Sequence, residues 1–389
     1  MHGLIIGLIV LIIFGVFEYQ RHKNYRKQIP LIIHINGTRG KSSVTRLIAA
    51  GLRAGKKKVI AKTTGSAPRL IYENGNEVPI IRHFGANIRE QLKIIKFVAK
   101  RQAEILVLEC MAVTPEYQWV TEQNIVKSNI GVITNSREDH LDVMGPGLKN
   151  VTLSLCNTLP HHSIAFTTEK KMYPLMKKQA HKMHTDLHFV EHQDITNDMM
   201  KGFSYIEHKE NVALSLAVCE HCGVDKEAAL KGMYEAIPDI GAAEIFKCKY
   251  GGKNFYFAHS FAANDPESTE ALVSYILSLY PDIDSVSIVL NTRSDRMFRS
   301  KQLMSMLKNQ DFNMLYLIGD EPQTIRLYAL SHGISTKKIV NCGWINGHDL
   351  IETAYEHASE TEMFLGIGNI GGNGAKIVAY FREKDGENV

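Results

Sequence analysis

The segment HINGTRGKSSVTRLIAAGL, from His34 to Leu52, constrains the fold more than any other part of the chain. It continues an apolar run typical of a buried strand and ends in a pattern typical of a helix. Two glycines in between, Gly37 and Gly40, allow a tight turn whose backbone N–H groups point at one anion, and the helix adds its positive end. A strand, such a turn and a helix in this order predict a nucleotide-binding α/β domain.

Two polar side chains, Lys41 and Ser42, directly follow the second glycine. A lysine at this place can reach the β- and γ-phosphates, and a serine hydroxyl can bind Mg²⁺. The usual P-loop has an earlier glycine where this chain has Ile35, so the match is to the shorter pattern G-T-x-G-K-[ST]. The alternative is a chance Gly-Lys-Ser turn, which the flanking strand and helix make less favourable. We expect nucleotide contacts from the whole turn: Asn36, Gly37, Thr38, Arg39, Gly40, Lys41, Ser42 and Ser43.

The rest of the chain alternates short β-rich runs with helical patterns, which predicts a mainly parallel sheet. Buried strands are expected at LIIHI, KVIAKT, EILVLECMAV and NIGVITNS. A second α/β block begins near KNFYFAHSFAAND and predicts a smaller C-terminal domain. The glycine pair in YGGKN, at 250–254, predicts the junction. We therefore expect a central domain at 30–249 and a C-terminal domain at 250–389.

The chain opens on an uncharged apolar run from Gly3 to Phe17. As a helix this run is about 22–25 Å long, slightly short of the ~30 Å hydrocarbon core of a bilayer. A signal peptide is the alternative, but no basic stretch precedes the run and no small-residue cleavage site follows it. The basic residues follow the run, which favours a cytoplasmic location for everything beyond it. We expect a single-pass membrane anchor at 1–20 and a basic juxtamembrane segment at 21–29.

Charge and cysteine content narrow the class of protein. The formal net charge is +4, which is too mild to argue for a nucleic-acid partner. The six cysteines are scattered and do not form the dense framework of a small secreted domain. A reducing, cytoplasmic environment is therefore expected for the domains beyond the anchor.

Two further segments place acids and a histidine at the ends of predicted strands. EILVLECMAV ends its apolar run at Glu109, where NTPases carry a metal-binding acid. TNSREDHLD places His140 between two acids, just past a strand end, at the carboxyl edge where such sheets bind ligands. A helix-capping aspartate is the alternative for the second segment. We expect Glu109 and His140 to complete, with Ser42, the coordination of a phosphate-bound Mg²⁺.

Taken together, NGTRGKSS, LECMAV and TNSREDHLD resemble the central domain of the Mur ligases and folylpolyglutamate synthases, which are ATP-dependent amide ligases. The anchor, NGTRGKSSVTRL, KTTG, ECMAV, EDHLDVMGP, SFAAND and GIGNIGG resemble the membrane-anchored poly-γ-glutamate synthases of the PgsB/CapB type over nearly the whole chain. The resemblance implies one transmembrane helix, a Mur ligase-like P-loop domain with a mainly parallel sheet, and a smaller Rossmann-like α/β domain.

The resemblance also implies the activity and its cofactors, ATP and Mg²⁺. Such a ligase activates a carboxylate as an acyl-phosphate and joins glutamates through γ-amide bonds, for a capsular or secreted polymer. The implied partners are glutamate, the growing poly-γ-glutamate and small membrane proteins of synthesis and export. Whether the chain forms a homo-oligomer is left open. Two rival functions also stay open: a ligase adding glutamate to another carboxylate acceptor, and a P-loop ATPase that energises transport.

Individual residues receive roles through the same resemblance. It implies that Lys41 stabilises the transferring phosphate and that Ser42, Glu109 and His140 serve Mg²⁺. It also implies that Asn211, in ENVALSLAV, lies on the adenine side.

Some positions depart from the Mur pattern. Ser154 stands where Mur enzymes often carry a carbamylated lysine that bridges a second metal, so we expect one metal or another ligand for the second. Ala242 or Ala243 replaces the arginine of the GRxE motif, which puts the ATP contact of that arginine in doubt.

The last domain also departs from its relatives. The DYAHNPDS motif reads FAANDPES at 261–268, where Asp265 or Asn264 could take over ribose or phosphate contacts. We expect no N-terminal domain before Ile35 of the kind that binds a UDP-sugar in Mur enzymes. This argues against a UDP-muramyl substrate.

Three arginines, Arg293, Arg296 and Arg299, follow the predicted strand SVSIVLNT. Ordinary surface charge is the alternative reading. Arginine pairs bidentately with carboxylates and keeps its charge at neutral pH. We therefore expect Arg293 and Arg296, together with Asp265, to contact the acidic substrate.

Overall fold

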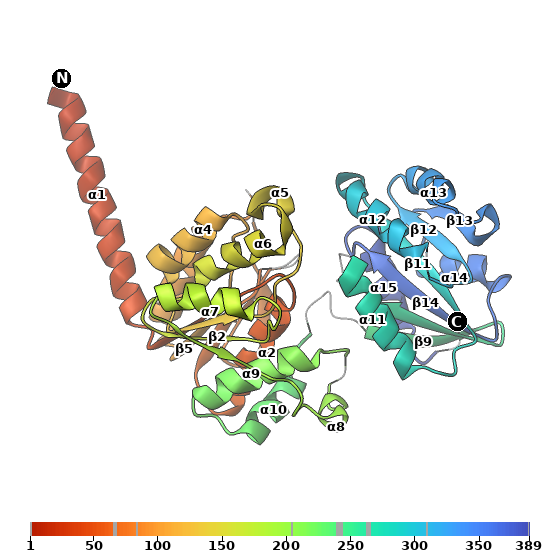
Figure 1. Cartoon of the computed structure of the whole chain (residues 1–389), viewed down its shortest axis with the longest axis horizontal. Helices are drawn as coiled ribbons and strands as arrows, with labels where there is room; N and C mark the ends of the chain where they lie inside the picture. The colour runs from red at the N-terminus through yellow and green to blue at the C-terminus, as the bar shows by residue number, and fades with distance from the viewer. Residues whose placement is uncertain are drawn as a thin grey trace. The chain divides into compact units, whose positions relative to one another are not determined.

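The computed structural model describes residues 2–64, 68–82, 85–203, 205–238, 244–261, 266–308, 310–387 and 389. The chain forms two compact units, Met1–Asp239 and Ile240–Val389. Each unit contains a mainly parallel β-sheet with helices on its faces (Figure 1). The predicted α/β class, with two sheets and one N-terminal apolar helix, is confirmed.

The first unit is built on an eight-stranded sheet with the order β4-β3-β2-β5-β1-β6-β7-β8. Its strands are β1 (Leu31–Asn36), β2 (Val59–Lys62), β3 (Arg69–Ile71), β4 (Glu77–Pro79), β5 (Ile105–Glu109), β6 (Ile130–Ile133), β7 (Ile164–Thr167) and β8 (Asp186–Phe189). Neighbouring strands in the part β2-β5-β1-β6-β7-β8 of this order are parallel. Strands β3 and β4 are added antiparallel at one edge of the sheet. Because parallel strands end at one edge, the segments after β1, β5 and β6 meet there.

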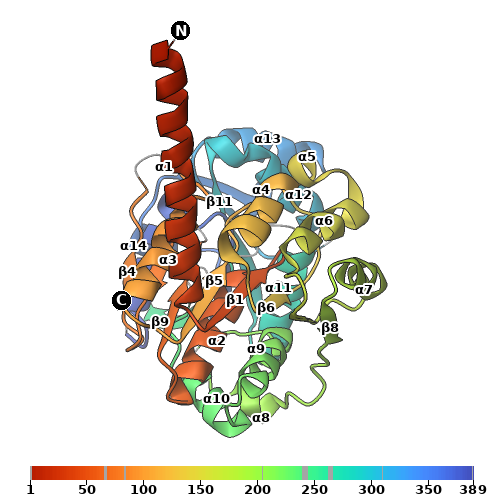
Figure 2. The same ribbon diagram turned by 90° about the vertical axis from the view of Figure 1, so that its left-hand side faces the viewer.

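Helices cover both faces of this sheet. They are α2 (Lys41–Ala54), α3 (Glu90–Lys100), α4 (Pro115–Val120), the π-helix η1 (Thr121–Val126), α5 (Leu141–Met144), α6 (Gly147–Leu155), the 3-10 helix η2 (Cys156–Thr158), α7 (Tyr173–Lys182), α8 (Asn197–Met200), α9 (Lys209–His221) and α10 (Lys226–Tyr234). Figure 2 shows α2, which follows the first strand, beside α9 and α10, and the three helices pack together. This packing holds the beginning of α2 against the carboxyl edge of the sheet.

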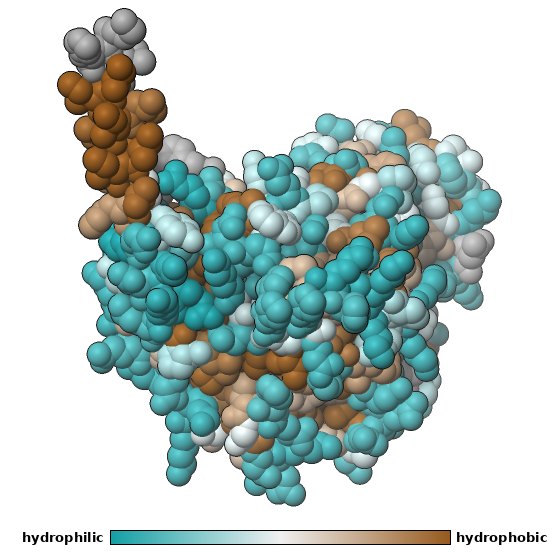
Figure 3. Space-filling view, turned by 60° about the vertical axis from the view of Figure 1, so that its left-hand side comes forward, coloured by the Kyte–Doolittle hydropathy of each residue, from teal (hydrophilic) through white to brown (hydrophobic). Residues whose placement is uncertain are grey.

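The N-terminal helix α1 (His2–Lys27) projects from the first unit and packs against α3 only near its own C-terminal end (Figure 2). Within the described residues, one helix is long and apolar enough to cross a membrane, over Ile5–Lys27. Its apolar side chains are exposed, and Figure 3 shows them as a brown projection from a mostly hydrophilic surface. A helix of the predicted kind is therefore present, while its crossing of a membrane and the side on which the rest of the chain lies stay predictions.

The second unit is built on a six-stranded sheet with the order β13-β12-β11-β14-β10-β9. Its strands are β9 (Glu244–Tyr250), β10 (Lys253–His259), β11 (Ser285–Thr292), β12 (Leu315–Gly319), β13 (Ile339–Gly343) and β14 (Thr361–Gly368). Its helices are α11 (Pro266–Leu279), η3 (Ser294–Arg296), α12 (Met297–Leu307), α13 (Pro322–Ser331), η4 (Thr336–Lys338), α14 (Gly347–Tyr355) and α15 (Asn373–Glu383). All neighbouring strands are parallel except β9, which is antiparallel to β10. Phe257 stacks on Phe381 in the core, with ring centroids 4.4 Å apart.

The expected domain junction at 250–254 is a β-hairpin instead. Gly251 and Gly252 both have positive φ, and they join β9 to β10, which pair from Tyr250↔Lys253 onward. A glycine pair suits a tight reversal of the chain as well as a linker. The division between the compact units comes earlier, after residue 239.

Candidate active site

The phosphate turn between β1 and α2 needs its two glycines for both conformation and space. Gly37 has φ +135° and Gly40 has φ +78°. A Cβ atom on Gly37 would lie 2.0 Å from the Oγ1 atom of Thr134, and one on Gly40 would lie 2.6 Å from Oδ1 of Asn211. Helix α2 begins directly after the turn without a side-chain cap. Its first backbone N–H groups are therefore available to an anion at the turn.

The segment after β6 braces this turn through hydrogen bonds. The backbone N–H of Thr38 donates to the carbonyl of Asn135 at 3.0 Å, and that of Arg39 donates to the Oδ1 atom of Asn135 at 3.0 Å. The N–H of Arg137 donates to the Oγ1 atom of Thr38 at 2.9 Å. Asp139 forms an ion pair of 3.3 Å with Arg39. The structure thus joins the two motifs NGTRGKSS and TNSREDHLD at one place.

Lys41 folds back over the turn. Its Nζ atom donates to the carbonyls of Gly37 at 2.6 Å and Thr38 at 3.1 Å. Burial lowers the pKa of Lys41, and the carboxylate of Glu109 opposes that shift. The ammonium group therefore lies along the turn that would hold the phosphates.

Ser42 and Glu109 meet, as the sequence predicts for residues after adjacent parallel strands. Ile35 of β1 lies opposite Glu109 of β5. The Ser42 hydroxyl donates to the Oε2 atom of Glu109 at 2.9 Å, and the backbone N–H of Thr64 donates to the same oxygen at 2.7 Å. Glu109 is only 2% exposed. Thr64 belongs to the KTTG motif, whose place after β2, next to β5, could have identified it.

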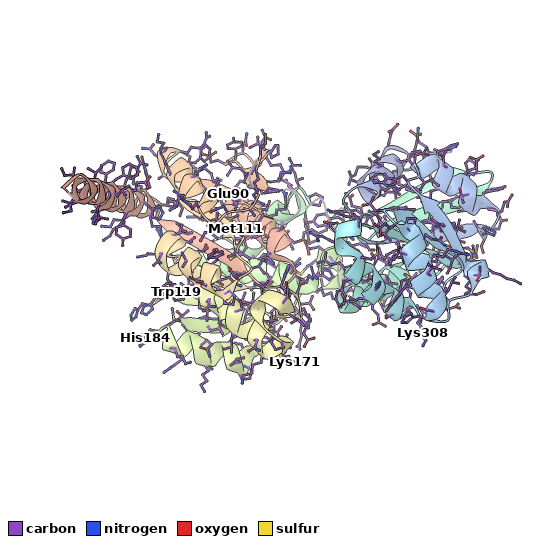
Figure 4. All side chains as sticks on the ribbon, turned by 90° about the horizontal axis from the view of Figure 1, so that it is seen from above. Glu90, Met111, Trp119, Lys171, His184 and Lys308 are labelled. Carbon is purple, nitrogen blue, oxygen red and sulfur yellow. The ribbon has the colours of Figure 1, made fainter. Side chains whose placement is uncertain are left out.

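Lys62, the last residue of β2, lies beside this acid. It is fully buried and forms an ion pair of 2.6 Å with Glu90, while its Nζ atom is 3.7 Å from the Sδ atom of Met111. Figure 4 labels Glu90 and Met111, which lie close together in the first unit. The carboxyl edge of the sheet therefore carries two lysines, Lys41 and Lys62, around Glu109.

His140, the predicted third metal ligand, directly precedes α5. It is exposed, has φ +49°, and its Nε2 atom lies 3.9 Å from the Oδ2 atom of Asp139. Across the described ranges, no group of three His, Cys, Asp or Glu side chains could hold a metal ion. Ser42 and Glu109 are brought together, and the metal role of His140 stays a prediction.

Asn211 contacts the phosphate turn from α9. It lies against Gly40, and its Nδ2 atom donates to the Oε1 atom of Glu207 at 2.8 Å. Burial raises the pKa of Glu207. The predicted position of Asn211 on the adenine side is not tested by these contacts and stays a prediction.

The side chain of Asn36 points away from the turn into a buried polar network. Its Nδ2 atom donates to Gln118 Oε1 at 2.8 Å and to Thr158 Oγ1 at 3.1 Å. Gln118 in turn donates to Ser154 Oγ at 2.9 Å. The Nδ2 atom of Asn36 is thus used within the protein, and Ser154, at the Mur lysine position, is part of this network.

A buried ion pair lies on the same face of β1. His34 Nδ1 is 2.7 Å from Glu122 Oε2, and neither side chain is exposed beyond 1%. Burial opposes a charge on His34, but hydrogen bonds to Cys110 and Glu122 outweigh it and raise the pKa of His34 to about 9. Glu122 belongs to the π-helix η1, a type of helix that often occurs at functional sites.

In the second unit, Arg293 already has a carboxylate partner. It binds Asp295 bidentately, with distances of 3.0 Å and 2.9 Å. Arg296 is exposed. The remaining predicted residues of this unit, Asp265 and Asn264, lie outside the described residues, as do Ala242 and Ala243.

An amide cluster that the sequence did not single out lies at the beginning of α15. It consists of Asn291, Asn369 and Asn373, all at most 4% exposed. Asn291 Nδ2 donates to the carbonyls of Asn369 and Gly371. Its Oδ1 atom, and the Nδ2 atoms of Asn369 and Asn373, have no hydrogen-bond partner within the described part of the chain. Unpaired buried amides are costly, so this cluster suits a polar ligand.

Comparison with known families matches both units. Residues 35–236 match the Mur ligase middle domain, and residues 245–384 match the poly-gamma-glutamate synthase CapB C-terminal domain. The capsule biosynthesis protein CapB of Bacillus anthracis is 34% identical over 387 residues, which cover 98% of this chain and 83% of that protein. The PGA synthase CapB of Bacillus subtilis (strain 168) is 33% identical over 385 residues, covering 98% and 97%.

Solved structures share the fold. FolC of E. coli in complex with ADP has a TM-score of 0.71 and 16% identity, covering 94% of this chain and 91% of that chain. A bifunctional folylpolyglutamate synthase/dihydrofolate synthase with Mn, AMPPNP and L-glutamate bound has a TM-score of 0.70 and 15% identity, covering 93% and 92%. At these identities the likeness concerns the fold alone.

Proposed function

This chain belongs to the CapB family of poly-γ-glutamate synthases, with a Mur ligase middle domain, and we propose that it is an ATP-dependent ligase that polymerises glutamate through γ-amide bonds. One observation carries the chemical part of this proposal. The hydroxyl of Ser42 and the carboxylate of Glu109 lie 2.9 Å apart, directly beside a glycine turn with Lys41 folded over it. This arrangement suits transfer of a phosphoryl group from ATP.

The reaction needs two bond-forming steps because a free carboxylate is a poor acyl donor. First, a carboxylate oxygen of the acceptor attacks the γ-phosphorus of ATP, ADP leaves, and an acyl-phosphate forms. The amine of an incoming glutamate then attacks the acyl carbon, loses a proton and expels phosphate. Lys41 lowers the repulsion between the two anions and stabilises charge on the transferring group.

The residues present fit a magnesium ion. A serine hydroxyl and a carboxylate are hard oxygen donors, and Glu109 is oriented by the backbone N–H of Thr64. Bound Mg²⁺ would neutralise charge on the phosphate oxygens. We propose Ser42 and Glu109 as ligands and retain His140 as a third. Ser154 supplies no carbamylated lysine for a second ion.

The amide cluster at the start of α15 is a candidate site for the incoming glutamate. The unpaired Oδ1 atom of Asn291 can accept from an amine, while the Nδ2 atoms of Asn369 and Asn373 can donate to a carboxylate. Arg293 lies next to this loop, since its Nη1 atom is 2.8 Å from where a Cβ on Gly371 would be. Arg293 and Arg296 are proposed to bind carboxylates of glutamate or of the polymer.

We also propose that α1 spans the cell membrane and that both units are cytoplasmic. The apolar, exposed part of α1 precedes the basic residues of its C-terminal end, which favours this orientation. Small membrane proteins of the same synthesis and export complex are proposed as partners, on the strength of the family resemblance.

An assay of product formation tests the proposal against its rivals. Membranes containing the full chain would receive ATP, Mg²⁺ and glutamate, and ADP and polymer would be measured together. A ligase should release ADP only as amide bonds form. ADP release without glutamate would instead support a transport ATPase, and glutamate incorporation without polymer would support another carboxylate acceptor.

A further inference from the structure

A groove of about 1320 Å³ lies where α1 leaves the first unit. One wall is the C-terminal half of α1, including Glu18, Tyr19 and Arg21, and the other is α3 with the segment before it. The π-helix η1 contributes Asn124 and Ile125. We call this the anchor groove.

The orientation of α1 at the anchor groove is fixed by hydrogen bonds. His22 Nε2 is 2.8 Å from the carbonyl of Ile125, and Arg26 Nε donates to the carbonyl of Val126 at 2.8 Å. Arg26 also donates to Asn129 Oδ1 at 2.8 Å. Since Gly15 lines the groove and lies within the apolar run, the groove opens where the proposed membrane-spanning part ends.

The lining of the anchor groove is basic. It contains five Lys and Arg residues but only two carboxylates, Glu18 and Glu90. Glu90 is already paired with Arg82 at 2.8 Å and with Lys62 at 2.6 Å. Three of the basic side chains, on or next to α3, form no ion pair within the described residues: Arg89, Lys93 and Lys96. Their charges are therefore available to an anion.

Apolar side chains complete the site. Tyr19 and Tyr25 of α1, together with Leu92 and Ile80, line the same groove as the cations. Tyrosine is common at membrane interfaces, where an apolar body and a polar tip are both satisfied. A ligand for this groove thus has a negative group beside an apolar part and lies at the level of the membrane surface.

We propose that the anchor groove binds the headgroup of an anionic phospholipid from the bilayer that α1 spans. The phosphate would contact Arg89, Lys93 and Lys96, and the glycerol and first acyl carbons would contact the tyrosines. Basic clusters directly beside a membrane helix attract anionic lipids. This inference rests on the membrane anchor proposed above.

Lipid retention tests the site directly. The full chain would be reconstituted into vesicles of equal parts phosphatidylcholine and phosphatidylglycerol, extracted in mild detergent, and examined by native mass spectrometry. We expect phosphatidylglycerol to be retained in preference to phosphatidylcholine. In the variant Arg89→Gln/Lys93→Gln/Lys96→Gln, the preference for phosphatidylglycerol over phosphatidylcholine should fall about fivefold for each charge removed. The total loss should be about a hundredfold. Lys93→Gln alone, at an exposed position, should lose about fivefold.

A control variant that loses the same number of charges distinguishes an effect of the groove from an effect of the total positive charge. Lys171→Gln/Lys178→Gln/Lys182→Gln removes three exposed lysines on and before α7, outside the groove, and should keep the wild-type preference. Equal loss in this control, or wild-type retention by the groove variants, would overturn the lipid site. A second measurement is the protection of Lys93 from an amine-modifying reagent. If inorganic phosphate protects Lys93 in phosphatidylcholine vesicles as well as phosphatidylglycerol does, the groove binds a soluble anion and the lipid site is overturned. If the wild-type chain does not float with either vesicle, the anchor proposal is wrong as well.

Discussion

Replacing Glu109 by Gln should weaken metal binding much more than nucleotide binding. In the folded chain, one carboxylate oxygen of Glu109 accepts from Ser42 at 2.9 Å and from the N–H of Thr64 at 2.7 Å. Glutamine keeps the shape but removes the charge. Each bond then falls from about 1.5–3 kcal/mol, for a charged acceptor, to about 1 kcal/mol. The two bonds together lose about 1–4 kcal/mol, in addition to the loss of a charged metal ligand.

A tenfold change in an equilibrium constant corresponds to about 1.4 kcal/mol, so a loss of about 1–4 kcal/mol should raise the Mg²⁺ concentration for half-maximal ADP release by about fivefold to several hundredfold. ADP release would be measured against Mg²⁺ at saturating ATP, and nucleotide affinity separately without metal. The affinity should change little, because the backbone N–H groups of the turn remain. Glu116→Gln, at an exposed position of α4, is the matched control. An unchanged Mg²⁺ requirement in a folded Glu109→Gln protein would refute the assignment.

Four further outcomes are expected. Lys41→Ala should abolish polymer formation in a folded protein, and Lys41→Arg should also fail because the compact ammonium is lost; polymer yield measures both. Deleting residues 2–17 should move the chain from the membrane to the soluble fraction on flotation. Arg293→Ala should raise the KM for glutamate about ten- to a hundredfold with little change for ATP, whereas a rise for ATP alone would indicate phosphate binding. The pKa of His34 in the folded chain is about 9, above its ordinary value of 6.5. Its contribution to stability is therefore complete below pH 6.5 and is lost as the pH rises through about 9. The melting temperature of the protein should fall over that pH range, and it should fall less in the His34→Gln variant.

The proximity of the predicted residues Ser42 and Glu109 follows from sheet geometry. Glycines, a lysine and a serine between a strand and a helix define the turn, and neighbouring parallel strands end at one edge. That rule, together with the observed pairing of β1 with β5, brings Ser42 beside Glu109, although the two are far apart along the chain. It also brings the segment after β6 to the turn, where Asn135 and Arg137 bind it.

The features that the sequence does not predict depend mostly on the direction of side chains and on the pairing of strands. Asn36 is the last residue of β1, and the sequence predicts it to be part of the phosphate turn. Because side chains alternate along a strand, its amide instead points to the face of the sheet where it binds Gln118. His140 comes after a strand end as expected, and its side chain is exposed. The glycine pair at 251–252 fits a linker and a hairpin equally well, and only the pairing of β9 with β10 distinguishes them. The motif GIGNIGG contains Asn369, but no motif joins it to Asn291, because the two residues come from different strand ends.

The π-helix η1 contacts both the strand that leads into the phosphate turn and the N-terminal helix α1. At its beginning, Glu122 binds His34, which lies on the strand that leads into the phosphate turn. At its end, the carbonyls of Ile125 and Val126 accept hydrogen bonds from His22 and Arg26 of α1. All these contacts involve one six-residue segment, so η1 links the strand before the phosphate turn to the C-terminal end of α1. On the proposal that α1 spans a membrane, these hydrogen bonds would hold the phosphate turn at a defined distance from the bilayer.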